Sequence, residues 1–343
     1  MKIFNSIRCL SVLRWMLALA VVISPSAAQA QWHAVVGAQS KDMGHQALAF
    51  LPNEIWIHAG DDITWTVDAD EIHTITFLKT GQVRAPFSSG CAAFPPGTPP
   101  VFSSTGVSFN GTACVSTPPL SKGDTFKVVF PTKGNFKLTC LVHENMTGTI
   151  HVLPIGDTLP HYQSFYDEQA ADQRKNLLSD ADAHDGHHDH DDGVTAAFGH
   201  TSVTVGIGEI VATGGGQQTT SVMRFFNKET TIHVGQTVEW TNNDPVTPHT
   251  VTFGVEPGNP MPPATNGTLI TDDDGALHFT ITSNATNVHS GFIIAAAHER
   301  IGVPTSGVGN TRVRVTFTKA GTYPYICALH DNLGMKGTIV VLP

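Results

Sequence analysis

The stretch "YICALHDNLGMKGTIVV", Tyr325–Val341, places a cysteine, a histidine and a methionine in one short segment. It closes on a Val/Ile-rich run of the kind found in β-strands, and a second such run leads into the cysteine. Cys327, His330 and Met335 therefore belong to a loop between two expected strands. The chain of 343 residues has 5 cysteines and 7 methionines, so their grouping here indicates a common role.

A large part of the chain occurs twice. "FLPNEIWIHAGDDITWT" (Phe50–Thr66) matches "FFNKETTIHVGQTVEWT" (Phe225–Thr241), and "IHTITF" (Ile72–Phe77) matches "PHTVTF" (Pro248–Phe253) in the same order. Segments rich in Val, Ile, Thr and Phe alternate with Gly, Pro, Asn and Asp throughout both copies, which predicts short strands joined by turns. We therefore expect an all-β chain with two copies of a Greek-key β-sandwich or barrel domain.

The first copy has its own version of the opening motif. "CLVHENMTG" contains Cys140, His143 and Met146. Each copy also has a histidine far upstream at the start of a strand-like run, His73 in the first and His249 in the second. Both copies thus offer one thiol, two imidazoles and one thioether.

This donor set predicts copper. Soft sulfur ligands and imidazoles suit copper, and a trigonal His₂Cys site with a weak axial Met is the blue-copper arrangement for electron transfer. Zinc is the chemical rival, but methionine is a poor zinc ligand. The predicted ligands are His73, Cys140, His143 and Met146 in the first copy, and His249, Cys327, His330 and Met335 in the second.

On these motifs the chain resembles the cupredoxin family, which includes plastocyanin, pseudoazurin and amicyanin. The resemblance covers most of both halves. Four residues separate His330 from Met335, as in plastocyanin and pseudoazurin, whereas two separate His143 from Met146, as in amicyanin. The resemblance implies two cupredoxin domains with one type 1 copper each.

The resemblance also implies a role for each histidine. The upstream histidine is a buried ligand, and the loop histidines His143 and His330 bring a ring edge to the surface, where electrons enter and leave. One departure is that many relatives have Asn after the upstream histidine, whereas this chain has Thr74 and Thr250. A neighbour at this place can tune hydrogen bonding to the cysteine sulfur.

The first residues have the features of a secretory signal. Lys2, Arg8 and Arg14 precede the apolar run Met16–Ile23, and "AQA" at Ala28–Ala30 fits a cleavage site. The run is too short to span a bilayer. We expect residues 1–30 to be removed near Ala30, and the protein to be periplasmic or secreted without stable membrane insertion. The net charge of −10 and the lack of a basic patch argue against a nucleic-acid partner.

Residues 31–153 and 198–343 form the expected domains, and residues 154–197 form an acidic, His-rich linker. Within it, 162–181 fits a short helix, whereas Asp180–Gly193 is almost all Asp, His and Gly and has too little apolar surface to fold alone. The histidines His184, His187, His188 and His190 form a possible auxiliary metal site. We favour a solvated spacer over loose capture of Cu(II), Zn(II) or Ni(II).

The remaining cysteines and histidines have separate interpretations. Cys91 and Cys114 flank a stretch rich in Pro, Gly and Ser, and we predict that they form a disulfide. His58 and His233 recur in both copies and are expected on the surface. The second copy's insertion adds His278, His289 and His298, which show no spacing typical of a further metal site.

Catalysis is less well supported than electron transfer. Multicopper oxidases use His-x-His pairs in their strands, and the only such pair here is His188 and His190, in the linker. Thr139 and Ile326, rather than histidines, precede the two ligand cysteines. We therefore expect a one-electron carrier that is not an enzyme, with an unidentified redox protein as donor and acceptor. A copper-handling protein that uses the His-rich linker is the alternative, followed by a divergent copper oxidoreductase.

Overall fold

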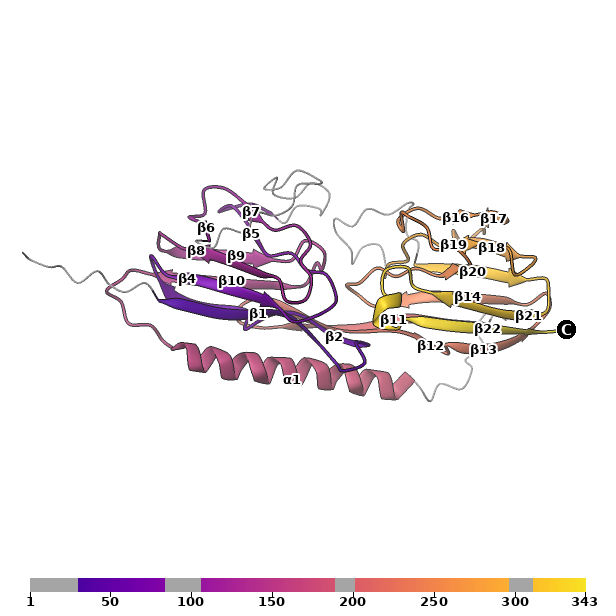
Figure 1. Ribbon diagram of the computed structural model, residues 1–343, viewed down its shortest axis with the longest axis horizontal. Coiled ribbons are helices and arrows are strands. Elements are labelled where there is room, and N and C mark those ends of the chain that lie inside the picture. Colours follow the sequence, from indigo (N-terminus) through magenta and orange to yellow (C-terminus); the bar gives the residue numbers. More distant parts are fainter. Residues whose placement is uncertain (1–29, 84–105, 189–200, 296–310) are drawn as a thin grey trace, which may run out of the picture.

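The computed structural model describes residues 30–83, 106–188, 201–295 and 311–343. These residues form two β-sandwich domains side by side, with one long helix, α1 (Gln163–His188), beneath the first of them and the junction (Figure 1). Strands dominate both domains, so the predicted all-β fold class is confirmed.

The first domain consists of two sheets packed around one aromatic core. Its strands are β1 (Gln31–Gln39), β2 (His45–Leu51), β3 (Glu54–His58), β4 (Asp62–Val67), β5 (Thr76–Phe77), β6 (Val107–Ser108), β7 (Val115–Ser116), β8 (Thr125–Val129), β9 (Gly134–Thr139) and β10 (Thr147–Leu153). One sheet has the order β3-β10-β9-β5-β7, and the other contains β2-β1-β4-β8-β6. Between them, Trp65 is fully buried and its ring meets Phe77 edge to face, with 5.4 Å between centroids.

The second domain repeats this plan. Its strands are β11 (Thr201–Ala212), β12 (Gln217–Phe226), β13 (Glu229–His233), β14 (Thr237–Asn243), β15 (Thr252–Phe253), β16 (Ala264–Thr265), β17 (Thr268–Thr271), β18 (Leu277–Ile281), β19 (Val288–His289), β20 (Arg312–Phe317), β21 (Gly321–Ile326) and β22 (Lys336–Leu342). The sheet β13-β22-β21-β15-β19-β16 faces β17-β18-β20-β14-β11-β12. Trp240 takes the place of Trp65, and its ring lies 5.7 Å from that of Phe253.

The two domains share one sheet. Strand β12 of the second domain pairs antiparallel with β2 of the first, with Ala47 opposite Thr220. The result is a single 11-stranded sheet that runs through both domains. The duplication in the sequence predicted two domains, but it carried no information about this pairing.

Helix α1 packs on the outer face of the shared sheet. Its Leu177 and Ala181 are buried, and the small side chains of Ala38, Ala47 and Ala49 let the helix approach closely. A short helix was predicted at 162–181 within the linker 154–197, and the structure has α1 over Gln163–His188. The helix extends beyond residue 181 into the acidic tract Asp180–Gly193, which was expected not to fold alone, because α1 gains packing on the sheet that the segment alone lacks.

Some predictions concern residues or side chains outside the described part. These are the signal segment up to residue 29, Cys91 and hence its disulfide with Cys114, His298, His190, and the side chains of His184, His187 and His188. The disulfide and the auxiliary metal site stay predictions. No described helix combines the length and the apolar character needed to cross a membrane.

Candidate metal centres

The upstream histidine of each domain is held by its backbone in the sandwich. His73 lies between β4 and β5 and exchanges two backbone hydrogen bonds with Leu120, of 3.2 and 2.7 Å. His249 does the same with Ile293, at 2.9 and 2.7 Å. Both histidines are fully buried, as predicted.

The other predicted ligands of the first domain lie on the loop between β9 and β10. Cys140 directly follows β9, and its amide donates to the carbonyl of Met146 over 2.9 Å. The Met146 amide in turn donates to the carbonyl of His143 over 3.3 Å. These two bonds close the loop, so the three residues share one tight turn.

The second domain closes a longer loop in the same way. The amide of Cys327 donates to the carbonyl of Met335, and the amide of Met335 donates to the carbonyl of His330, both over 3.1 Å. The extra residues form a 3₁₀ turn, η3 (Asp331–Leu333), which ends at Gly334 with a φ of 87°. Both methionines are fully buried within their loops.

Three donor atoms meet in the first domain. Nδ1 of His143 lies 3.2 Å from Nδ1 of His73 and 3.7 Å from Sγ of Cys140. The three residues are fully buried. All three donor atoms lie within 4.8 Å of one another, a spacing that fits a single metal ion.

The same arrangement recurs in the second domain. Nδ1 of His249 lies 3.1 Å from Nδ1 of His330, and Sγ of Cys327 lies 3.9 and 3.4 Å from these two nitrogens. These two groups are the metal-like clusters of His, Cys, Asp and Glu found in the part of the chain that the structure describes. In each domain the structure thus brings together the cysteine and two histidines expected from the sequence.

Backbone amides and threonine hydroxyls surround the two sulfurs. The amide of Thr74 donates to Sγ of Cys140 over 3.4 Å, and the amide of Thr250 donates to Sγ of Cys327 over 3.3 Å. Each threonine hydroxyl also accepts a 2.7 Å hydrogen bond from the amide that follows the cysteine. Thr74 and Thr250 therefore link the upstream histidine to the ligand loop.

The sulfurs are favoured as thiolates, the form that binds metal. Burial raises the pKa of Cys140, but hydrogen bonds and charge from His143 and His73 outweigh it, and the pKa lies well below its usual range. Burial likewise opposes ionisation of Cys327, and the charge of His330 and the hydrogen bond with His249 lower the pKa of that thiol. A thiolate facing two imidazole nitrogens is the donor chemistry that suits copper.

The loop histidines lie at the junction of the two domains. His143 is fully buried and His330 is 3 % exposed. The expectation that their ring edges reach the surface, which came from single-domain relatives, is therefore wrong for this chain. Packing of one domain against the other covers both rings.

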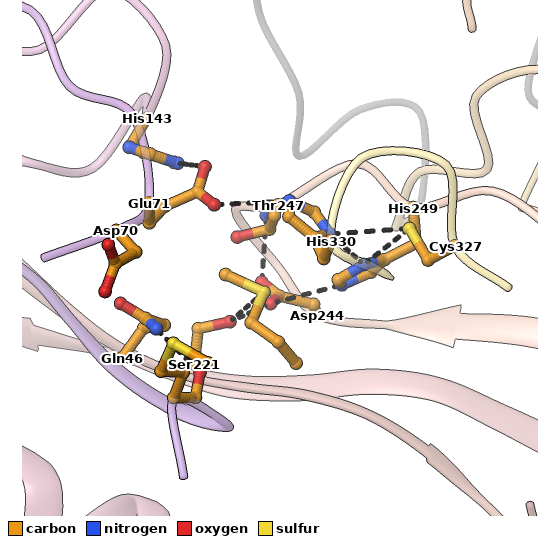
Figure 2. Close-up of polar contacts among 12 residues, drawn as sticks. Gln46, Asp70, Glu71, His143, Ser221, Asp244, Thr247, His249, Cys327 and His330 are labelled. Carbon is orange, nitrogen blue, oxygen red and sulfur yellow. Dashed lines mark hydrogen bonds and ion pairs between the residues drawn. The ribbon is translucent and has the colours of Figure 1, made fainter. Parts of the chain in front are cut away.

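Glu71 lies between the two loop histidines (Figure 2). Its Oε1 is 3.2 Å from Nε2 of His143, and its Oε2 is 3.5 Å from Nε2 of His330. Burial raises the pKa of Glu71, but the charge of His330 and the hydrogen bond from His143 lower it to about 2. Sequence reasoning missed this residue. The sequence did contain one signal: the first copy has an acid two positions before His73, whereas the second copy has Thr247 at the matching position.

A second buried carboxylate lies beside the upstream histidine of the second domain. Oδ2 of Asp244 lies 3.6 Å from Nε2 of His249 and accepts a hydrogen bond from the Ser221 hydroxyl (Figure 2). Burial raises the pKa of Asp244, but its bonds to His249 and Ser221 lower it. Sequence reasoning also missed Asp244. It lies near His249 in the sequence, but closeness in sequence does not show that two side chains are in contact.

A partly open cavity of about 400 Å³ adjoins both loop histidines and Glu71. Its apolar lining includes Ile72, Leu141, Val142, Met261, Phe292 and Leu329. Residues from both domains build it, so the junction keeps a recess beside the two sites.

Other histidines have different contacts. His233 is exposed, as expected, whereas the ring of His58 is partly buried and contacts the carbonyl of Asp157 over 2.8 Å. His278 pairs with Asp272, at 3.1 Å. His289 is bonded to the Thr252 hydroxyl, at 2.8 Å.

The family of the chain follows from a family model. The model described as copper binding proteins, plastocyanin/azurin family, matches residues 37–153 and 209–342. The chain belongs to this family, and both of its domains are members. The predicted resemblance is thereby confirmed. No curated protein matches the chain at a significant level.

Similar solved structures are single cupredoxins. Oxidised plastocyanin from Dryopteris crassirhizoma is 20% identical over 41% of this chain and 99% of its own, with a TM-score of 0.21. A purple cupredoxin from Nitrosopumilus maritimus is 22% identical over 36% of this chain and 99% of its own, with a TM-score of 0.23. A reduced Cu(I) form of mutant amicyanin is 16% identical over 37% of this chain and 87% of its own, with a TM-score of 0.24.

Proposed function

We propose that this protein is an exported one-electron carrier with a type 1 copper in each domain. The observation that carries the proposal is the repeated, buried set of two Nδ1 atoms and one Sγ within 4.8 Å. Copper held by these atoms supplies reversible one-electron Cu(II)/Cu(I) chemistry. Met146 and Met335, buried in the same loops, are the proposed axial ligands.

The protein's own groups keep each site rigid and dry. The loop is closed by the backbone bonds between cysteine and methionine, and the upstream histidine is fixed in the sandwich. The amides of Thr74 and Thr250 donate to the sulfurs and stabilise their negative charge. A donor set fixed in this way changes little between oxidation states, which favours fast electron transfer.

The proposed route of electrons follows from the burial of the loop histidines. The junction cavity reaches His143 and His330, and its apolar lining suits contact with a redox protein that acts as donor or acceptor. The predicted secretory signal supports a periplasmic or secreted location. Electron transfer is the proposed role because each cluster offers the cysteine and two histidines of a type 1 donor set.

The test is a visible and EPR spectrum of the mature protein, with copper counted per chain. Two coppers and an intense blue band support the proposal. Cys327→Ser should abolish the type 1 signal of the second domain and keep that of the first, and Cys140→Ser should do the reverse. A colourless protein that still binds copper would contradict the carrier function and favour the copper-handling alternative.

A further inference from the structure

We propose that Glu71 joins the two copper sites into one coupled pair, so that an electron passes directly from one domain to the other through this side chain. The inference rests on the proposed function, because it requires copper in both domains. It adds an internal transfer step and a positioning role for a residue that is not a ligand.

The contacts define a short path. Each oxygen of the Glu71 carboxylate meets a different histidine, His143 at 3.2 Å and His330 at 3.5 Å. In both histidines the Nε2 atom faces the carboxylate and the Nδ1 atom faces the metal-binding cluster. One carboxyl group is therefore all that separates the ligand rings of the two domains along this path.

Metal binding strengthens the same contacts. A histidine that binds metal through Nδ1 carries its proton on Nε2, and metal-bound imidazoles commonly donate this proton to a carboxylate. With both sites filled, His143 and His330 each donate to Glu71. Nε2 of His143 is buried and makes no hydrogen bond with the described residues, and the Glu71 carboxylate, 3.2 Å away, is the acceptor beside it that can receive its proton.

The bridge is specific to this acid. Glu71 is 6 % exposed, and a buried carboxylate is costly unless charged or hydrogen-bonding groups surround it. The neighbouring Asp70 lines the same cavity, but its carboxylate accepts from Gln39 over 2.5 Å and lies 3.6 Å from Lys122. The position that matches Glu71 in the second copy is Thr247, so the junction carries one bridging acid instead of two that would repel.

Other contacts tie the second ligand loop to the first domain. Arg224, on β12, donates to the carbonyl of Leu333 in the second ligand loop over 2.7 Å. The same guanidinium donates to Asp42, in the first domain, over 3.0 Å. Together with the β2–β12 pairing, this link holds the second ligand loop against the first domain, to which Glu71 belongs.

The transfer step is balanced in electrons and protons. One copper is oxidised from Cu(I) to Cu(II) while the other is reduced from Cu(II) to Cu(I). No covalent bond breaks, and both Nε2 protons stay on their rings.

The first experiment measures this step by pulse radiolysis of the mature protein with both coppers bound. Cys327→Ser gives the spectrum of the first site alone, and Cys140→Ser gives that of the second. Where the two blue bands overlap, Met146→Gln is introduced into every protein compared, to shift the band of the first site away from that of the second. We expect a kinetic phase whose rate does not depend on protein concentration. In this phase the blue absorption of one site falls while that of the other returns. Glu71→Ala should slow this phase by about tenfold or more, and Glu71→Gln, which keeps one acceptor oxygen, should slow it less.

Asp70→Asn is the matched control. It makes the same change from acid to amide one residue away and contacts neither histidine, so its rate should equal that of the wild type. A protein with two blue coppers and no such phase, or with the same rate after Glu71→Ala, would overturn the coupling and leave the proposed function intact. Fewer than two blue coppers would instead count against the proposed function.

A second measurement tests the Glu71 bridge without relying on electron transfer. NMR of the fully reduced protein, which is diamagnetic, should show slowly exchanging Nε2–H protons on His143 and His330 in the wild type and in Asp70→Asn. Both should lose protection from exchange in Glu71→Ala. Unchanged protection in that variant would show that the histidines donate elsewhere, and the bridge would be wrong.

Discussion

The backbone of Gly37 lies against the ring of His73. A β-carbon at Gly37 would be 2.5 Å from Nε2 of His73, and the residue has a φ of +70°. Gly206 has the same relation to His249, with a distance of 2.3 Å and a φ of +63°. Each glycine lies at a shift in strand register, so a β-bulge in the shared sheet forms a wall of each proposed copper site.

Gly37→Ala should therefore damage the first site and spare the second. The added methyl group forces the His73 ring away from the position that faces Cys140, and the type 1 absorption of the first domain should weaken or vanish. Gly81→Ala is the control, because Gly81 also has a positive φ, of +79°, but has no atom within 4 Å of the added carbon. Gly81→Ala should lower the free energy of unfolding by about 1 kcal/mol through backbone strain alone, without a steric clash. Equal spectra of the two variants would refute this role of Gly37.

Thr74→Val should destabilise the first ligand loop. The substitution keeps the shape of the side chain but removes the hydroxyl that accepts from the buried amide of Leu141 over 2.7 Å. Leaving that amide without a partner costs about 1–3 kcal/mol in the free energy of unfolding. Urea unfolding of the copper-free protein measures the loss. Thr74→Ser keeps the hydroxyl and should behave much more like the wild type, and a Val variant as stable as the Ser variant would argue against the bond.

Asp244→Asn should weaken copper binding in the second domain alone. Oδ2 of Asp244 lies 3.6 Å from Nε2 of His249, whereas no carboxylate of the described residues forms such an ion pair with His73. Loss of such an outer partner lowers metal affinity by about 10–100-fold. Competition with a copper chelator measures this, with the other site removed by Cys140→Ser. The same substitution in a Cys327→Ser background should leave the affinity of the first site unchanged.

The sequence predicted the parts of each site that are local and repeated. Cys140, His143 and their counterparts stand a fixed few residues apart on a loop between strands, so the motif alone indicated the donor set. The upstream histidines were found because the same strand pattern surrounds both. Glu71 was missed because its partner His330 belongs to the other domain, and only the tertiary structure brings them together.

The errors in the prediction have a related cause. Whether a loop histidine is exposed depends on what packs over the loop, and the β2–β12 pairing that places the second domain there involves backbone edges that leave no motif. The length of helix α1 was underestimated for a similar reason, since the sequence predicted a helix only at 162–181. Its apolar face is small, and Leu177 and Ala181 gain their burial from alanines on distant strands.

The contacts of Asp42 with Ser40, Gly44 and Arg224 predict a specific dependence of stability on pH. Partial burial raises the pKa of Asp42, but hydrogen bonds from Ser40 and the Gly44 amide and the charge of Arg224 lower it from 3.8 to about 2. Because the folded protein has the lower pKa, ionised Asp42 stabilises the fold above about pH 4, and this contribution is lost as the pH falls toward 2.

Asp42→Asn isolates this contribution. The Asp42 side chain is 64% exposed, so screening by solvent limits the effect to about 0.5 kcal/mol. At neutral pH the variant should unfold at a slightly lower urea concentration than the wild type, and the difference should close as the pH falls from 4 to 2. Lys41→Gln is a suitable surface control, since it changes a neighbouring charge and should produce no difference that closes in this window. A gap between wild type and Asp42→Asn that stays constant down to pH 2 would show that ionised Asp42 does not stabilise the folded protein.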